Sequence, residues 1–131
     1  MEPRFLLIDE VIEIQEDQVI RYGGTFGVRD RGLLESAVMA PRATFGGQLL
    51  HADLFEMAAA YLCYLVGDHP FVDGNKRTWA VAAVVFLALN DHDLAAEEDL
   101  FEALVRGVAE GRVGKAGVAA FLRANDRPSA D

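Results

Sequence analysis

The chain has 131 residues, of which 52% are hydrophobic, and it carries a formal net charge of −9. This length suffices for one domain with a real core and is too short for two ordinary ones, so we expect a single domain over residues 1–131. Nucleic-acid binders and proteins at anionic membranes present basic surfaces, so the acidic balance argues against DNA, RNA and membranes as direct partners. A small anion such as a nucleotide stays open, because local cations and oriented N–H groups decide its binding.

Cysteine usage and hydropathy indicate where the protein works. Cys63 is the only cysteine, so the chain can form no internal disulfide and no cysteine zinc cluster. The apolar run from Phe5 to Ile8 meets acidic residues at once, unlike a secretory signal. The apolar run from Trp79 to Leu89 is shorter than the roughly 18 residues that indicate a membrane span. We therefore expect a cytoplasmic protein.

Apolar residues recur at helical spacing along most of the chain, and little of it alternates as a strand would. Asp30 and Asp53 each precede an apolar helical face and are predicted to be N-caps. The segment after Gly74 is apolar on most faces, which predicts a central buried helix. The expected class is all-α, with about six helices. They run from Ile8 to Tyr22, from Asp30 to Pro41, from Asp53 to about Val66, from about Asn75 to Asn90, from Glu97 to Gly111, and from about Lys115 to Ala124.

Two segments between and after these helices lack a helical pattern. Residues Arg42 to His51 contain Gly46-Gly47 and then a short apolar run, which fits either a short hairpin or an irregular flap. We expect the flap. The tail from Asn125 to Asp131 is polar and contains Pro128, so we expect it to be frayed.

Titratable, charged and polar side chains are concentrated in the segment from His69 to Thr78, which reads HPFVDGNKRT. A glycine-containing turn that opens a helix directs several N–H groups outward without intrahelical acceptors, and the helix dipole adds positive potential, so the place suits a phosphate. Lys76 and Arg77 strengthen that field. His69 would lie beside the bound phosphate as a base, and Asp73 is placed to hold a magnesium ion between them.

Each of these side chains also has a structural explanation. His69 could be an ordinary loop histidine, and Asp73 could cap the following helix. Gly74 could serve only the backbone turn, and Asn75 could form hydrogen bonds within it. The two cations that follow could belong to a solvated first turn, although cations there oppose the helix dipole at roughly 0.3–1 kcal/mol each. A bound anion would remove that penalty.

The same segment resembles the H-x-F-x-D-G/A-N-K-R signature of the Doc branch of the Fic/Doc family, toxins of the death-on-curing type. Seven defined positions in nine agree, and Arg21-Tyr22-Gly23-Gly24, Arg29-Asp30 and Gly32-Leu33-Leu34-Glu35 extend the likeness over nearly the whole chain. The resemblance implies the all-helical Fic fold. The matching residues are His69, Phe71, Asp73, Gly74, Asn75, Lys76 and Arg77.

The resemblance also implies roles for these residues around a bound ATP molecule. His69 would be the general base that takes a proton from a target hydroxyl. Phe71 would anchor the loop, and Asp73 would ligate Mg²⁺. The phosphates would be bound by an anion hole at Gly74 and Asn75 and by the cations Lys76 and Arg77. These parts suit phosphoryl transfer, which needs mainly positioning and charge neutralisation.

Two positions bear on which part of ATP is transferred. Fic proteins that transfer AMP usually continue the motif as G-N-G-R-x-x-R, with glycine at the position of Lys76 and arginine at that of Ala80. Both departures place this chain with Doc, whose chemistry is transfer of the γ-phosphate to a threonine of elongation factor Tu. The resemblance therefore implies a protein kinase that stops translation. The alternatives are AMP transfer and a catalytically silent module that binds an antitoxin and acts as a co-repressor.

The resemblance further implies two protein partners. The chain contains no S/T-x-x-x-E/G-N pattern of an inhibitory helix, so we expect a separate antitoxin similar to Phd, whose C-terminal segment folds into a groove near the site. We expect target choice to lie in the flap, which would align an extended peptide by strand addition. The flap residues are Phe45, Gly46, Gly47, Gln48 and Leu49.

Overall fold

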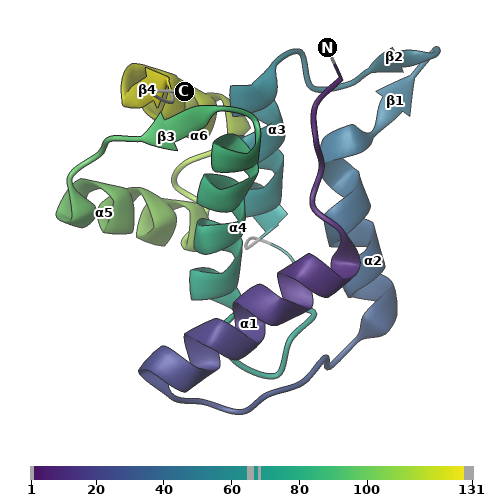
Figure 1. Ribbon diagram of the computed structural model, residues 1–131, viewed down its shortest axis with the longest axis vertical. Coiled ribbons are helices and arrows are strands. Elements are labelled where there is room, and N and C mark those ends of the chain that lie inside the picture. Colours follow the sequence, from purple (N-terminus) through teal and green to yellow (C-terminus); the bar gives the residue numbers. More distant parts are fainter. Residues whose placement is uncertain (1, 65–66, 68, 129–131) are drawn as a thin grey trace.

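The computed structural model of the chain describes residues 2–64, 67 and 69–128, and it is built from six α-helices with only short strands (Figure 1). This arrangement confirms the all-α prediction. No helix in these ranges is long and apolar enough to cross a membrane. The helices are α1 (Ile8–Tyr22), α2 (Arg31–Met39), α3 (Leu54–Cys63), α4 (Asn75–Leu89), α5 (Glu98–Ala109) and α6 (Lys115–Ala124).

The predicted caps set two of the helix starts. The Asp30 carboxylate accepts a hydrogen bond from the Leu33 N–H, and the Asp53 carboxylate accepts one from the Glu56 N–H, so both N-caps are confirmed. A single 3₁₀ turn (Ala40–Arg42) that contains Pro41 follows α2. The predicted end of the third helix, at Val66, lies outside the described residues.

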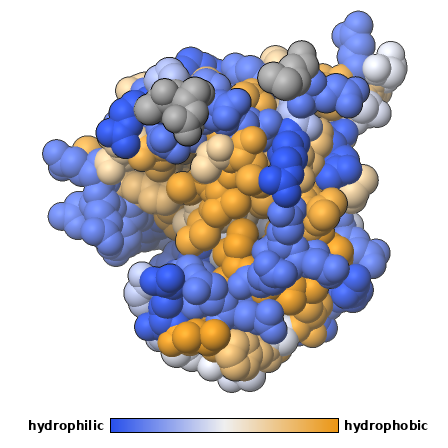
Figure 2. Space-filling model, viewed as in Figure 1, coloured by the Kyte–Doolittle hydropathy of each residue, from blue (hydrophilic) through white to orange (hydrophobic). Residues whose placement is uncertain are grey.

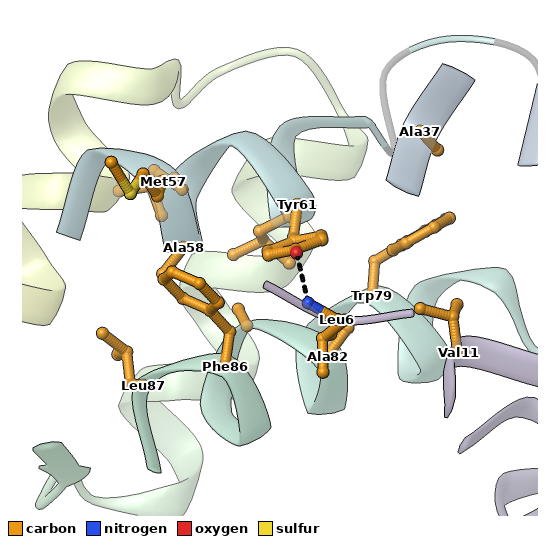
Figure 3. Close-up of a cluster of buried hydrophobic side chains, with 14 of the residues drawn as sticks. Leu6, Val11, Ala37, Met57, Ala58, Tyr61, Trp79, Ala82, Phe86 and Leu87 are labelled. Atoms are coloured by element: carbon orange, nitrogen blue, oxygen red, sulfur yellow. Dashed lines mark hydrogen bonds between the residues drawn. The ribbon is translucent and has the colours of Figure 1, made fainter. Parts of the chain in front are cut away.

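Helix α4 runs through the middle of the fold, as predicted, and packs against α1, α3 and α5 (Figure 1). Its Trp79 and Phe86 are fully buried, and Phe86 lies against the ring of Tyr61 from α3 (Figure 3). The Tyr61 hydroxyl accepts a hydrogen bond of 3.0 Å from the Leu6 N–H, and burial raises the pKa of Tyr61 to about 12. This core holds α4 in place, and with it the loop that precedes its first residue.

The expected irregular flap was wrong in shape, because the segment forms a regular two-residue hairpin. Strands β1 (Thr44–Phe45) and β2 (Gln48–Leu49) pair antiparallel around Gly46 and Gly47. These glycines have φ values of 60° and 81°, as a type I′ turn requires. All four strand residues are exposed.

The expected frayed tail was wrong for residues 126–128. Strand β4 (Asp126–Pro128) pairs antiparallel with β3 (His92–Leu94), which follows a turn at Asp91 with φ of 70°. The pairing is reinforced by His92, whose Nδ1 lies 2.8 Å from Asp126 Oδ1. Residues 129–131 of the predicted tail lie outside the described residues.

Candidate functional site

The N-terminus of α4 opens on a glycine in a left-handed conformation. Gly74 is the N-cap residue, with φ of 73° and ψ of 17°, and no side chain caps the helix. The capping alternative for Asp73 is therefore wrong, since its carboxylate accepts a hydrogen bond of 2.8 Å from the Thr25 N–H instead. The N–H groups of the first turn, from Asn75 to Arg77, have no intrahelical acceptors by helix geometry.

These groups border a pocket of about 350 Å³, a size within the usual range for ligand sites of about 300–1,000 Å³. The pocket brings together six of the seven residues matched in the motif and adds two glycines from the end of α1. Cations, a carboxylate, an imidazole and helix N–H groups thus share one cavity. Its lining residues are Gly23, Gly24, His69, Asp73, Gly74, Asn75, Lys76 and Arg77.

The seventh motif residue, Phe71, is buried and does not line the pocket. Its side chain is 1% exposed, and its ring centroid lies 6.2 Å from that of Trp79. The side chain of Asn75 bridges the main chain of Phe71 with two buried hydrogen bonds of 3.0 Å. The turn hydrogen bonds suggested by the sequence for Asn75 are therefore present. The main-chain N–H of Asn75 belongs to the first turn of α4.

A second segment, between α1 and α2, holds the main chain of the motif loop. Val28 forms an isolated antiparallel bridge with Phe71, and the Val72 N–H donates to Gly27 O at 3.0 Å. Arg29 donates from its main-chain N to Pro70 O at 2.7 Å and from Nε to His69 O at 2.8 Å. The orientation of His69, whose side chain is exposed, therefore depends on a segment about 40 residues earlier in the chain.

The two motif cations differ in their surroundings. The side chain of Lys76 is exposed. Arg77 is half-buried: its Nη2 donates to Gly23 O at 3.3 Å, and its guanidinium carbon lies 5.1 Å from the ring centroid of Tyr22. Tyr22 is 64% exposed, so the last residue of α1 flanks the site rather than the core.

Lys76 and Arg77 also border a second pocket of about 420 Å³, formed by α1, α4 and α5. Figure 2 shows it as a hollow between the hydrophilic surfaces of α1 and α5, with hydrophobic side chains of the central helix in its floor. Its apolar lining comes from Ala80, Val81, Phe101 and Val105. The two pockets thus meet at the motif cations.

The surroundings of Asp73 fit a magnesium ion held together with phosphates. Asp73 is exposed at the pocket wall, and one of its carboxylate oxygens is oriented by Thr25. Among the described residues, no three His, Cys, Asp or Glu side chains form a group that could hold a metal ion by themselves. Mg²⁺ in nucleotide sites is commonly bound by one or two carboxylates plus phosphate oxygens, which is the arrangement that one carboxylate beside an anion pocket allows.

The structure does not bring the predicted flap residues to this pocket. Leu49 lines a different pocket together with Leu89 and Asn90, at the C-terminal end of α4. The motif lies at the other end of this 15-residue helix, which at 1.5 Å per residue is about 22 Å long. Figure 1 shows the hairpin near the top of the view and the start of α4 near the bottom. Target alignment by the hairpin stays a prediction.

Fold and pocket together define an all-helical protein in which a histidine and two cations lie at the N-terminus of the central helix. The model of the Fic/DOC family matches residues 5–87, which is more than half of the chain. The chain belongs to this family, which confirms the resemblance seen in the motif.

Two relatives are similar over long segments. A protein named Toxin Doc from Mycolicibacterium smegmatis is 47% identical over 81 residues, which cover 62% of each chain. A protein named Protein kinase doc from Escherichia phage P1 is 32% identical over 120 residues, or 92% of this chain and 94% of that protein. The match thus spans less than two thirds of the mycobacterial relative and nearly all of the phage protein.

Proposed function

We propose that the protein is the toxin of a toxin–antitoxin pair and transfers the γ-phosphate of ATP to a hydroxyl of a cytosolic protein, with elongation factor Tu as the expected target. One observation carries this proposal: Lys76, His69 and Asp73 line one pocket at the N-terminus of α4. The names of the two relatives, one a toxin and one a protein kinase, support it.

In this proposal the chain binds the triphosphate mainly through positive potential. The first-turn N–H groups of α4 and the cations Lys76 and Arg77 would bind phosphate oxygens, and Gly74 presents no side chain to obstruct them. Asp73 would hold Mg²⁺, which when bound would neutralise charge on the phosphates. Because these groups are fixed before the substrate arrives, their orientation costs little during the reaction.

His69 would then act on the incoming hydroxyl. The hydroxyl oxygen forms a bond to the γ-phosphorus while the bond from that phosphorus to the bridging oxygen of ADP breaks, and the hydroxyl proton passes to the imidazole. Arg29 would be a positioning residue, since its Nε holds the main-chain oxygen of His69 at 2.8 Å. ADP is the leaving group, and its terminal oxygen keeps the electron pair of the broken bond.

Lys76 and Ala80 favour phosphoryl over AMP transfer. Lys76 places a long cationic side chain at a position that AMP-transferring relatives leave as glycine. Ala80 lies in the neighbouring pocket, where it offers no second cation for a phosphate. AMP transfer remains the alternative enzyme reaction, and a silent antitoxin-binding module remains the alternative without catalysis.

The second pocket is the place we propose for a segment of a Phd-like antitoxin. Its apolar floor suits a short amphipathic helix, and its edge includes Lys76 and Arg77, so an occupant would cover part of the phosphate site. Co-purification from the native host should recover a small companion protein. Recovery of the same companion with a Phe101→Arg variant of this chain would place the partner elsewhere.

One experiment separates the three functions. The protein is incubated with host extract and ATP that is labelled at either the α or the γ phosphate. Protein labelling from γ alone supports the kinase, labelling from α supports AMP transfer, and no labelling from either rejects both enzyme functions. The His69→Ala variant serves as the control and should label nothing.

A further inference from the structure

The geometry points to Gln15 as a positioning residue that holds Asp73 and Thr25 in the arrangement needed for binding a metal–nucleotide complex. Gln15 lies in the middle of α1 and does not line the pocket itself. This inference rests on the proposed function, because it concerns how the same site is assembled.

The side chain of Gln15 connects three parts of the chain. It is 1% exposed, and its Nε2 donates to the main-chain oxygens of Asp73 at 3.1 Å and of Thr25 at 3.3 Å. An amide nitrogen carries two N–H donors, so one group satisfies both carbonyls. A buried amide is retained in a core only where such partners exist, since burying it unpaired is unfavourable.

The same two segments are joined a second time on the pocket side. The Thr25 N–H donates to Asp73 Oδ2 at 2.8 Å, so main chain and carboxylate are both tied to Thr25. Gly24 permits this approach, because a Cβ atom there would lie 3.2 Å from the Asp73 Cβ. Gln15 therefore sets the position of the Asp73 backbone, and Thr25 sets the direction of its carboxylate.

Groups that orient a metal ligand without touching the metal strongly affect metal affinity, typically by about 10- to 100-fold. Gln15 occupies that position relative to Asp73. Its neighbours on the buried stripe of α1, Val11 and Val19, have apolar side chains, which cannot hydrogen-bond to a pocket residue. Packing alone therefore does not account for an amide at position 15.

The test measures binding of Mn²⁺, as a spectroscopic substitute for Mg²⁺, to the full chain in the presence of a non-hydrolysable ATP analogue. Gln15→Leu should weaken Mn²⁺ binding in the ternary complex by about 10- to 100-fold. Gln18→Leu is the matched control: it changes the same residue type on the same helix, also buried, but its amide donates to Asp17 at 3.3 Å. The control should bind Mn²⁺ as the parent does.

A second variant keeps the test independent of a general loss of folding. In Gln15→Glu the ionised carboxylate faces two carbonyl oxygens and can donate a hydrogen bond to neither. Its Mn²⁺ affinity at neutral pH should therefore be lowered as in Gln15→Leu, while its affinity for the ATP analogue without metal should match that of the parent, because the N–H groups of α4 and the nearby cations bind the phosphates. A merely structural role of Gln15 would lower the affinity for the analogue with and without metal alike.

The outcomes distinguish a failure of the proposed function from a failure of the role of Gln15 alone. If the parent binds no metal–nucleotide complex, the proposed function fails and the role of Gln15 fails with it. If the parent binds and both Gln15 variants bind Mn²⁺ as well as the parent does, only the role of Gln15 is overturned. Weakened binding in a folded Gln15→Leu chain, with an unchanged Gln18→Leu control, supports it.

Discussion

The side chain of Asn75 pairs with the main chain of Phe71 as a second peptide group would. Its Oδ1 accepts from the Phe71 N–H at 3.0 Å, and its Nδ2 donates to the Phe71 oxygen at 3.0 Å. Both bonds are buried, and between the two residues lie Asp73 and Gly74. The loop that carries the pocket is thus closed on itself by the first residue of α4.

Replacing Asn75 with leucine should therefore damage both stability and binding. The change leaves two buried main-chain groups unpaired, at about 1–3 kcal/mol each. The free energy of unfolding, measured by urea denaturation, should therefore fall by about 2–6 kcal/mol. Affinity for ATP, measured by calorimetry below the unfolding transition, should fall as well, because the loop loses its shape.

Asn90 provides a matched control at the other end of α4. Its Nδ2 donates to Arg4 O at 3.0 Å and to Phe86 O at 2.8 Å, and its Oδ1 accepts from the Arg4 N–H at 2.8 Å. Asn90→Leu should lower stability yet leave ATP affinity unchanged. Equal losses of ATP affinity in both variants would show that Asn75 has no special relation to the pocket.

Lys76→Ala should weaken nucleotide binding without removing it. Charge-assisted hydrogen bonds are worth about 1.5–3 kcal/mol, so the dissociation constant for ATP should rise about 10- to 100-fold while the helix N–H groups still bind phosphate. Arg31→Ala is the control, since it removes an exposed cation that pairs with Glu35 on α2. An ATP affinity that is unchanged in the Lys76 variant would contradict the phosphate role.

Alanine variants of Gly23 and Gly24 test whether the close contact between the Gly24 main chain and Asp73 matters for metal binding. Both have positive φ values, of 87° and 114°, so alanine strains the backbone at either position. A Cβ at Gly23 would meet nothing within 4 Å, whereas one at Gly24 would lie 3.2 Å from the Asp73 Cβ. Both variants should lose stability, but only Gly24→Ala should weaken Mn²⁺ binding in the nucleotide complex. Equal metal affinity in the two would contradict the arrangement around Asp73.

His51 should make the fold less stable in mild acid. Its pKa is lowered from 6.5, first by burial and next by Lys115, whose Nζ lies 3.0 Å from its Nδ1. Because the unfolded chain then binds a proton more readily than the folded one, the stability contribution is fully present above pH 6.5 and is lost as the pH falls toward the folded-state pKa.

The measurement is urea unfolding across this range together with an NMR titration of the imidazole. In Lys115→Met the pKa of His51 should rise toward 6.5 but remain below it, since burial is the larger cause. The His51→Gln variant should show a smaller loss of stability below pH 6.5 than the parent. A His51 titration at or above 6.5 in the parent would contradict this account.

Local signals explain why the helices could be predicted so closely. Asp30 and Asp53 cap helices because a short acceptor side chain satisfies an N–H two or three residues later, and this depends only on neighbouring residues. The strand pair β3 and β4 was missed because its partners lie more than 30 residues apart. The hairpin was considered but the irregular flap was expected, although Gly-Gly is a known signal for a two-residue turn.

The pocket residues could likewise be predicted from the motif, but the residues that hold them in place could not. Arg29 and Thr25 act through main-chain contacts that no spacing reveals. Gln15 did leave a signal: it lies four residues after Val11 and four before Val19, so an amide occupies the buried stripe of α1. A polar residue on such a stripe indicates a specific buried partner, although the sequence does not name it.

The most direct test of the central claim is the intact mass of purified elongation factor Tu after incubation with this protein, ATP and Mg²⁺. We expect a gain equal to one phosphoryl group, located on a hydroxyl side chain, and no gain with the His69→Ala variant. A gain equal to AMP, or an equal phosphoryl gain with the His69→Ala variant, would contradict it.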